Sequence, residues 1–214
     1  MTNGSRSSAR TRSPGLPDRE ARRIETHLGR REARRERLSV RARELRREAQ
    51  AMMIGLHEGR ADRAKARRLS RALRSLSRAT TTEASADAPL VRDALQEGVE
   101  ALLLEAIVDR RPLPGPRALG VEPEPYLLGL GDVVGEVRRR ALGQLAHDDL
   151  AAAEASVRLM ERLYQTLMRF DTTRAIVPLK PKQDAARGLL ERTRGEVVMA
   201  RVHSRYRLAR SEEE

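Results

Sequence analysis

Four acidic side chains stand at helical spacing within two apolar stretches, and they are the residues of this sequence best suited to chemistry. Glu97 and Glu100 are i,i+3 neighbours on one face of a predicted helix, with Asp93 one turn earlier. Asp132 and Glu136 are i,i+4 neighbours in a second helix rich in Leu, Val and Gly. Carboxylates in such apolar surroundings are costly unless cations, hydrogen bonds or raised pKa values compensate for their burial.

The spacing of these acids leaves two interpretations open. If the two helices pack side by side, the four carboxylates converge, and hard oxygen ligands of this kind suit Mg²⁺ or Mn²⁺. A metal ion held there can activate water and hold a scissile phosphate. Alternatively, the acids form salt bridges with arginines of neighbouring helices. The spacing alone favours this alternative, because i,i+4 acids are common on Arg-rich helices.

Other catalytic patterns are missing from the sequence. It has no cysteine, which excludes disulfides and thiolate chemistry and is typical of a reducing cytosol. The four histidines lie far apart without a metal-binding pattern, and we expect most of them at the surface: His27, His57, His147 and His203. Three glycines near Asp132 do not form a phosphate-binding loop and are predicted to be close helix–helix packing positions: Gly129, Gly131 and Gly135.

The elements that must position the acids are helices. Aromatic residues make up only 2% of the chain and Trp is absent, so the core must consist of Leu, Val, Ile, Met and Ala, which favour helix together with abundant Arg and Glu. Runs of β-branched residues alternating with polar ones are almost missing, which argues against a sheet. We therefore predict an all-α, single-domain bundle of six to seven helices. The predicted helices cover residues 19–58, 62–78, 87–108, 126–142, 147–170 and 182–208.

Apolar patterning predicts which helices are central. The first helix carries a single stripe at alternating steps of four and three: Leu38, Ala42, Leu45, Ala49, Met52 and Leu56. The helices predicted over 87–108, 126–142 and 147–170 are apolar on more than one side. We therefore expect these helices to lie at the centre of the bundle or to meet another subunit.

Turn-forming and charged residues predict the boundaries. Asp87 is the expected N-cap of its helix, and Gly143 is expected to end the helix that contains Asp132. Residues 111–125 contain five prolines and are predicted to form a crossover or a functional loop. The predicted organisation is a disordered Arg/Ser-rich tail (1–18), a helical domain (19–208) and an acidic C-terminal tail (209–214).

The net charge of +12 is concentrated in one part of the chain. Residues 1–80 hold 23 Lys and Arg against 9 Asp and Glu, whereas residues 81–214 hold 20 against 22. An anionic polymer such as nucleic acid is the natural partner of the basic segment, and a solvated helix face is the alternative. The N-terminus has no apolar signal region, and no run of about 18 apolar residues occurs. We therefore expect a cytoplasmic protein without a membrane span.

Two segments resemble the acidic helices of Trax proteins. Tyr126–Glu136 has the tyrosine, two leucines and glycine followed by two acids four positions apart, and Leu95–Ala101 has both glutamates in register. Glu161–Met168 and Leu179–Gln183 are similar to parts of the last two helices. With the long basic first helix, the similarity covers about residues 31–200. The chain resembles the translin/Trax family, in particular its single-gene archaeal homologues.

This resemblance implies a seven-helix fold that assembles into a closed, octamer-like homo-oligomer. It also implies an interior Mg²⁺-dependent endoribonuclease site, because the catalytic acids of Trax fall here on acidic residues. Translin, which mainly binds RNA, replaces several of these acids. Arg92 matches a basic position that contacts nucleic acid in translin. The residues implied as both catalytic and metal-binding are Glu97, Glu100, Asp132 and Glu136.

The sequence therefore predicts an RNA-binding endoribonuclease that depends on Mg²⁺ or Mn²⁺ and acts on single-stranded or small structured RNA. One of its acids would act as a general base on the attacking water. The alternative is a translin-type protein that binds single-stranded RNA or DNA without cleaving it, in which the acids are structural. A third hypothesis is a helical protein that bridges partners through its charged first helix.

Overall fold

The computed structural model describes residues 16–81, 89–170 and 177–211, and all regular structure within them is helical. This confirms the all-α prediction. The seven helices are α1 (Asp18–His57), α2 (Arg63–Thr81), α3 (Pro89–Val108), α4 (Pro116–Leu119), α5 (Pro123–Ala146), α6 (Leu150–Met168) and α7 (Lys180–Ser211). Among the described residues, no helix is both long and apolar enough to span a membrane.

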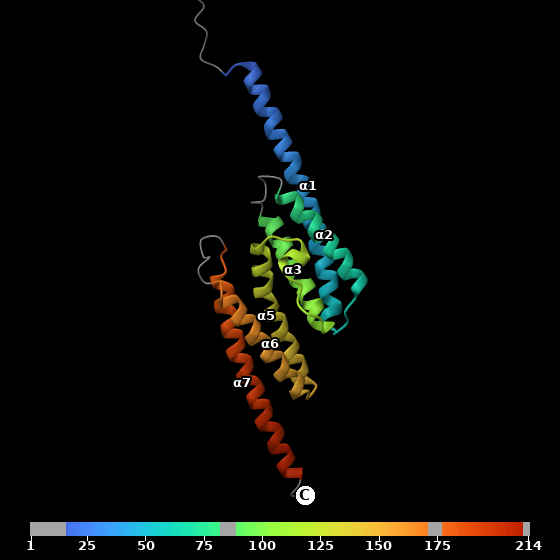
Figure 1. Cartoon of the computed structure of the whole chain (residues 1–214), viewed down its shortest axis with the longest axis vertical. Helices are drawn as coiled ribbons and strands as arrows, with labels where there is room; N and C mark the ends of the chain where they lie inside the picture. The colour runs from blue at the N-terminus through green and yellow to red at the C-terminus, as the bar shows by residue number, and fades with distance from the viewer. Residues whose placement is uncertain (1–15, 82–88, 171–176, 212–214) are drawn as a thin grey trace, which may run out of the picture.

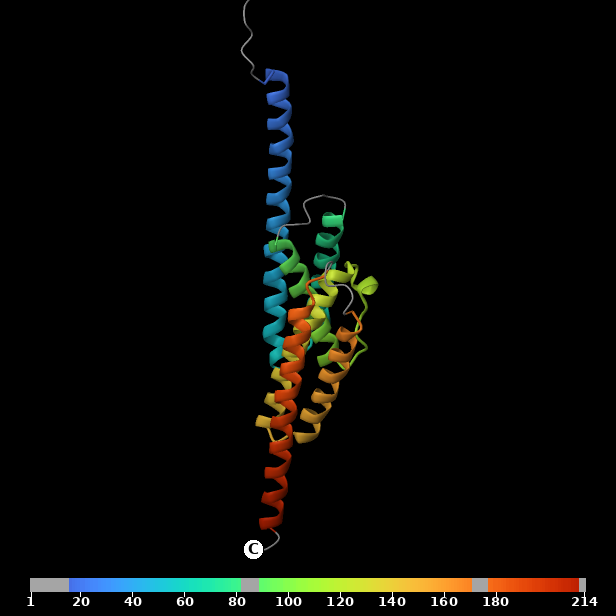
Figure 2. The same ribbon diagram turned by 90° about the vertical axis from the view of Figure 1, so that its left-hand side faces the viewer.

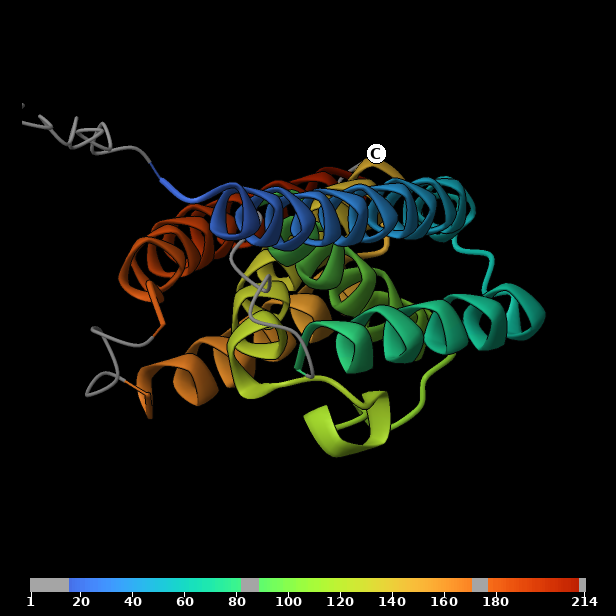
Figure 3. The same cartoon turned by 90° about the horizontal axis from the view of Figure 1, so that it is seen from above.

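The helices form an elongated bundle with α3 and α5 at its centre. Helix α3 packs against α1, α2 and α5, and α5 packs against α3, α6 and α7. The N-terminal half of α1 and the C-terminal half of α7 project beyond the bundle at opposite ends (Figures 1 and 2). Seen from above, α1 and α7 lie on one side of the central pair, with α2, α4 and α6 on the other (Figure 3).

Burial follows the predicted apolar pattern. All six residues of the stripe on α1 are buried, and α3 buries side chains on more than one side, including the consecutive Leu102, Leu103 and Leu104. This confirms that α3 is central. Helix α6 differs from the prediction because it buries a single stripe: Ala153, Ser156, Met160, Leu163 and Leu167. The projecting part of α1 has no such cover, and Ile24 and Leu28 are about half exposed there, at 49% and 55%.

Two glycines allow α5 to approach its neighbours closely. A Cβ atom on Gly129 would lie 2.8 Å from the Gln96 carbonyl oxygen of α3, and one on Gly131 would lie 2.8 Å from the Cβ of Lys182 of α7. These two packing positions are confirmed. The prediction is wrong for Gly135, where a Cβ would meet nothing nearer than a Leu189 methyl at 3.9 Å.

Several predicted boundaries are also corrected. Helix α5 begins at Pro123 rather than at residue 126, because proline is well suited to the first turn of a helix. It passes through Gly143 without a break and ends at Ala146, with His147 as its C-cap next to the left-handed Asp148 (φ 57°). The Gly143 prediction failed because a single glycine costs a helix only about 1 kcal/mol. The proline-rich loop contains the one-turn helix α4, closed by Gly120 at φ 69°.

The predicted tails fall largely outside the described residues. Helix α1 begins at Asp18, the last residue of the predicted N-terminal tail, and α7 continues to Ser211, three residues beyond its predicted end. The expected N-cap Asp87 also lies outside the described residues. A different helix, α2, has a cap that was not predicted. The carboxylate of Asp62 accepts hydrogen bonds from two backbone amides of its first turn.

Candidate active site

The four acids lie on the two central helices and form one electrostatic cluster. Glu97 and Glu100 are on α3, and Asp132 and Glu136 are on α5, which packs against it. All four side chains are partly buried, and that of Glu136 is only 19% exposed. The pKa of Glu100 is raised by each of the other three carboxylates. We call these four residues the acidic cluster.

Helix α1 supplies a basic partner to each of two acids. The guanidinium of Arg46 donates to both oxygens of Glu97, with Nε–Oε2 and Nη2–Oε1 distances of 3.1 and 2.8 Å. His57 Nε2 lies 2.8 Å from Oε2 of Glu136. Arg46 and His57 are eleven residues apart, which is close to three helical turns, so both point from the same face of α1.

Asp132 has partners on two other helices. Lys182 of α7 forms an ion pair with Oδ1, and the side-chain amide of Gln96 on α3 donates to Oδ2. The side chain of Lys182 lies close against α5 because Gly131 has no side chain there. Asp132 therefore holds α3, α5 and α7 together at the level of the acidic cluster.

Glu100 differs from the other three acids. Within the part of the chain that the structure describes, its carboxylate has no hydrogen-bond or ion-pair partner. Its pKa is raised to about 7, mainly by burial and then by the charges of Asp132 and Glu136, while Lys182 opposes the shift. The basic partners therefore do not fully balance the negative charge of the acidic cluster, and the raised pKa of Glu100 reflects this imbalance.

The cluster suits a divalent cation in its chemistry, although three of its acids face basic side chains. Four carboxylates supply the hard oxygen ligands that Mg²⁺ and Mn²⁺ prefer, and the perturbed Glu100 is the group that a cation would stabilise in its ionised form. In the described residues, however, no group of three or more acidic or histidine side chains is arranged to hold a metal ion. Their role as metal ligands stays a prediction.

The salt-bridge interpretation is realised in part. Of the three acids with a basic partner, Glu97 has an arginine, Asp132 has a lysine and Glu136 has a histidine. Arg138, which follows the acids in the sequence, instead binds Glu196 of α7 through two hydrogen bonds of 2.7 and 2.8 Å.

The surroundings of the cluster include further basic groups. A cavity of about 290 Å³ opens beside Glu136 and is lined by His57, Arg139, Arg140 and His147, among others. Arg92, the predicted nucleic-acid contact, is exposed one turn before Gln96 on α3. Helical geometry places both residues on the same side of α3, and the structure does not test the contact itself.

Sequence reasoning missed the partners of the acids. Arg46 and His57 each follow a buried residue of the α1 stripe, so they border the buried face, but no motif distinguishes them. All four histidines are exposed, as expected, although the contact with Glu136 leaves the side chain of His57 only 27% exposed. Gln96 and Lys182 lie within segments that carry the resemblance to Trax, and this was the available signal.

Comparison with known proteins places the chain among relatives of this fold. No protein-family model matches it. A segment of 104 residues is 43% identical to an uncharacterized protein of Methanocaldococcus jannaschii, covering 48% of this chain and 47% of that protein. The match thus spans about half the length of this curated relative.

Three solved structures match over most of the chain. The crystal structure of AfC3PO is 30% identical, with 86% of this chain and 98% of that chain covered and a TM-score of 0.67. AfC3PO in complex with duplex RNA is 29% identical, with coverages of 86% and 97% and a TM-score of 0.70. Apo-NeC3PO is 18% identical, with coverages of 88% and 100% and a TM-score of 0.75, and shows the fold alone. Because this chain covers nearly the whole length of AfC3PO at 30% identity, the chain belongs to the translin/Trax family of C3PO proteins.

Proposed function

We propose that this protein binds RNA and cleaves it at the acidic cluster with the help of Mg²⁺ or Mn²⁺. The observation that carries the proposal is that the other three carboxylates of the acidic cluster all act on Glu100, which has a pKa of about 7 and no partner among the described residues. The relative AfC3PO has been crystallised with duplex RNA, which supports an RNA ligand for this chain.

The proposed metal ligands are Glu97, Glu100, Asp132 and Glu136. When bound, the metal would supply Lewis-acid stabilisation of a phosphoryl oxygen and lower the pKa of a water molecule. The chain's own basic groups would take a second role. Arg46, Lys182 and His57 border the same carboxylates, so they are placed to hold non-bridging phosphate oxygens that come close to the cluster.

The RNA backbone would be held by the basic first helices and Arg92. Backbone contacts of this kind position RNA with little base specificity, and their affinity falls as salt concentration rises. The sequence favours single-stranded or small structured RNA, whereas the relative was crystallised with a duplex. Both forms therefore belong in the test.

A homo-oligomer, closed and octamer-like, is proposed as the functional assembly. The projecting part of α7 exposes four apolar side chains that one chain leaves uncovered: Val198, Met199, Val202 and Tyr206. Burying such a surface between copies would stabilise an assembly. Native mass spectrometry of the wild type should show a single oligomer, and Val202→Asp should shift it to smaller species. A monomeric wild type would reject this assembly.

The nuclease proposal is tested by cleavage of labelled single-stranded and duplex RNA with Mg²⁺, Mn²⁺ or EDTA. Wild type is compared with Asp132→Asn and with Glu191→Gln, a matched control on the exposed surface of α7. We expect metal-dependent cleavage by the wild type and the control, lost in Asp132→Asn with RNA binding retained. Cleavage that persists in Asp132→Asn would exclude the acidic cluster as the active site.

The second candidate is an RNA-binding protein without catalysis. It is favoured by the basic partners of Glu97, Asp132 and Glu136, which give these acids a structural role. Its signature in the same experiment is salt-sensitive binding with no cleavage under any metal. That result would make the acidic cluster a set of ion pairs that joins α1, α3, α5 and α7.

A further inference from the structure

A second polar cavity lies on the opposite side of α3 from α1 and α7. It has a volume of about 490 Å³, opens to solvent and is bordered by α2, α3 and the segment around α4. We call it the arginine pocket, because five arginines line it: Arg63, Arg67, Arg71, Arg74 and Arg111. None of its lining residues belongs to the acidic cluster, so it is a site separate from the proposed nuclease centre.

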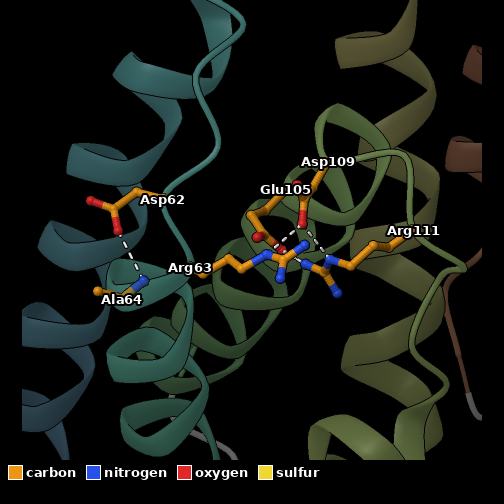
Figure 4. Close-up of polar contacts among 6 residues, drawn as sticks. All are labelled: Asp62, Arg63, Ala64, Glu105, Asp109 and Arg111. Carbon is orange, nitrogen blue, oxygen red and sulfur yellow. Dashed lines mark hydrogen bonds and ion pairs between the residues drawn. The ribbon is translucent and has the colours of Figure 1, made fainter.

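The arginines of this pocket fall into two groups. Arg63 and Arg111 both pair with Asp109, with Nε–Oδ2 distances of 2.9 and 2.7 Å, and Arg111 also pairs with Glu105, so two acids balance these two arginines (Figure 4). Arg67 and Arg71 have no ion pair within the residues that the structure describes. Arg74 donates to two neutral oxygens of Ser70, the hydroxyl at 2.7 Å and the backbone carbonyl at 3.3 Å. Three guanidinium charges are thus uncompensated at one cavity.

Glu105 is a buried acidic residue in the wall of the pocket. Its side chain accepts a hydrogen bond from Arg111, and the residue is only 2% exposed. The other oxygen, Oε1, is buried without a hydrogen-bond partner among the described residues. A buried carboxylate oxygen without a donor is costly, so a donor is missing at this wall. Glu105 and Asp109 also fix Arg111 in place, as the converging side chains in Figure 4 show.

The remaining wall is apolar. Leu102, Leu119 and Ala66 are buried residues that line the cavity, together with Pro114 and Ala118. Sites for small molecules commonly combine about 300–1,000 Å³ of concave space, an apolar wall and a few polar groups. A ligand that satisfies all three features carries an anionic group, a flat organic part and a hydrogen-bond donor.

We propose that the arginine pocket binds a phosphorylated small molecule of mononucleotide size. Its phosphates would contact Arg67, Arg71 and Arg74, since guanidinium groups bind phosphate oxygens through paired hydrogen bonds. Its ring would lie on the apolar wall, with an amino or imino group directed towards Glu105. A continuous RNA strand fits less well, because Arg63 and Arg111 are already paired with Asp109 and Glu105, which leaves three guanidinium groups at one cavity to bind phosphates.

The proposal is tested by isothermal titration of the full chain with ADP, GDP, CDP and UDP, with inorganic pyrophosphate and adenosine as the phosphate-only and ring-only probes. The test variant is Arg67→Glu/Arg71→Glu. The matched control is Lys65→Glu/Arg68→Glu, which makes the same charge change on exposed positions of α2 outside the pocket. Thermal melting of both variants establishes that they are folded, which their exposed positions favour.

We expect at least one nucleoside diphosphate to bind the wild type and the control more tightly than pyrophosphate or adenosine does. Binding by the test variant should be about 10- to 100-fold weaker, the effect of losing a charged hydrogen bond or two. The proposal is overturned by the absence of binding for every probe or by equal affinities of the two variants. It is also overturned if the test variant loses only RNA binding, because the arginines are then a contact for the RNA backbone.

Discussion

Replacing Glu100 with glutamine should stabilise the metal-free protein at pH 8 and have much less effect at pH 5. The reason is the position of Glu100, which is partly buried beside three other carboxylates and has a pKa of about 7 instead of 4.5. Above pH 7 the folded chain must hold this charge without a partner among the described residues. Glutamine keeps the size of the side chain and removes the charge.

The sign and size of the effect follow from proton linkage. Between pH 4.5 and 7 the unfolded chain has released this proton while the folded chain retains it, so stability falls as the pH rises through this window. The shift corresponds to about 3 kcal/mol at most, and solvent screening of a partly exposed group reduces it to roughly 2 kcal/mol. For a chain of this size the melting temperature should differ by about 4–8 °C.

The assay is thermal and urea unfolding of wild type and Glu100→Gln in EDTA from pH 5 to pH 8. The difference between the two proteins should grow as the pH rises and level off above pH 7. Glu97→Gln is the control, because it removes the partner of Arg46 and should destabilise the protein at both pH values. A Glu100→Gln variant that is no more stable than wild type at pH 8 would refute the electrostatic reasoning.

Three further predictions concern glycine packing, an interhelical ion pair and a helix cap. Gly129→Ala should destabilise the bundle by about 1–3 kcal/mol in urea unfolding through overpacking, whereas Gly143→Ala, which faces open space, should stabilise it by roughly 0.5–1 kcal/mol. Equal effects of the two variants would contradict the packing argument. Arg138→Ala, which removes the bidentate contact between α5 and Glu196 of α7, should cost about 1–3 kcal/mol in the same assay. Asp149→Ala should cost about 1 kcal/mol and reduce helical circular dichroism, because Asp149 caps α6; unchanged unfolding curves would contradict these two predictions.

The sequence allowed the helices and the faces of the acids to be predicted, because that information is local. The stripe on α1 repeats with the helical period, so its burial follows from one helix alone. In the same way, the i,i+3 spacing of Glu97 and Glu100 and the i,i+4 spacing of Asp132 and Glu136 fix which side of each helix carries the charge. The resemblance to Trax then indicated that the two faces meet.

The partners of the acids depend on packing that local spacing does not encode. Residues 1–80 contain 23 Lys and Arg, and nothing in the sequence distinguishes Arg46 from its neighbour Arg47. Arg46 contacts Glu97 because it lies on the face of α1 that packs against α3. The glycines show the same limit. Gly129, Gly135 and Gly143 look alike in the sequence, yet only Gly129 has a neighbouring backbone within reach of a Cβ atom. Whether a helical glycine allows close packing depends on which element lies opposite it.

The distribution of charge explains why RNA binding and cleavage would depend differently on metal. The chain carries a net charge of +12, but the acidic cluster sets four carboxylates against two permanent positive charges, those of Arg46 and Lys182. Phosphates are attracted to the basic helices and repelled by the uncompensated cluster. RNA would therefore bind the surrounding surface without metal, whereas its approach to the cluster requires an additional cation. If the chain cleaves RNA as proposed, this charge pattern predicts binding in EDTA together with cleavage only in Mg²⁺ or Mn²⁺.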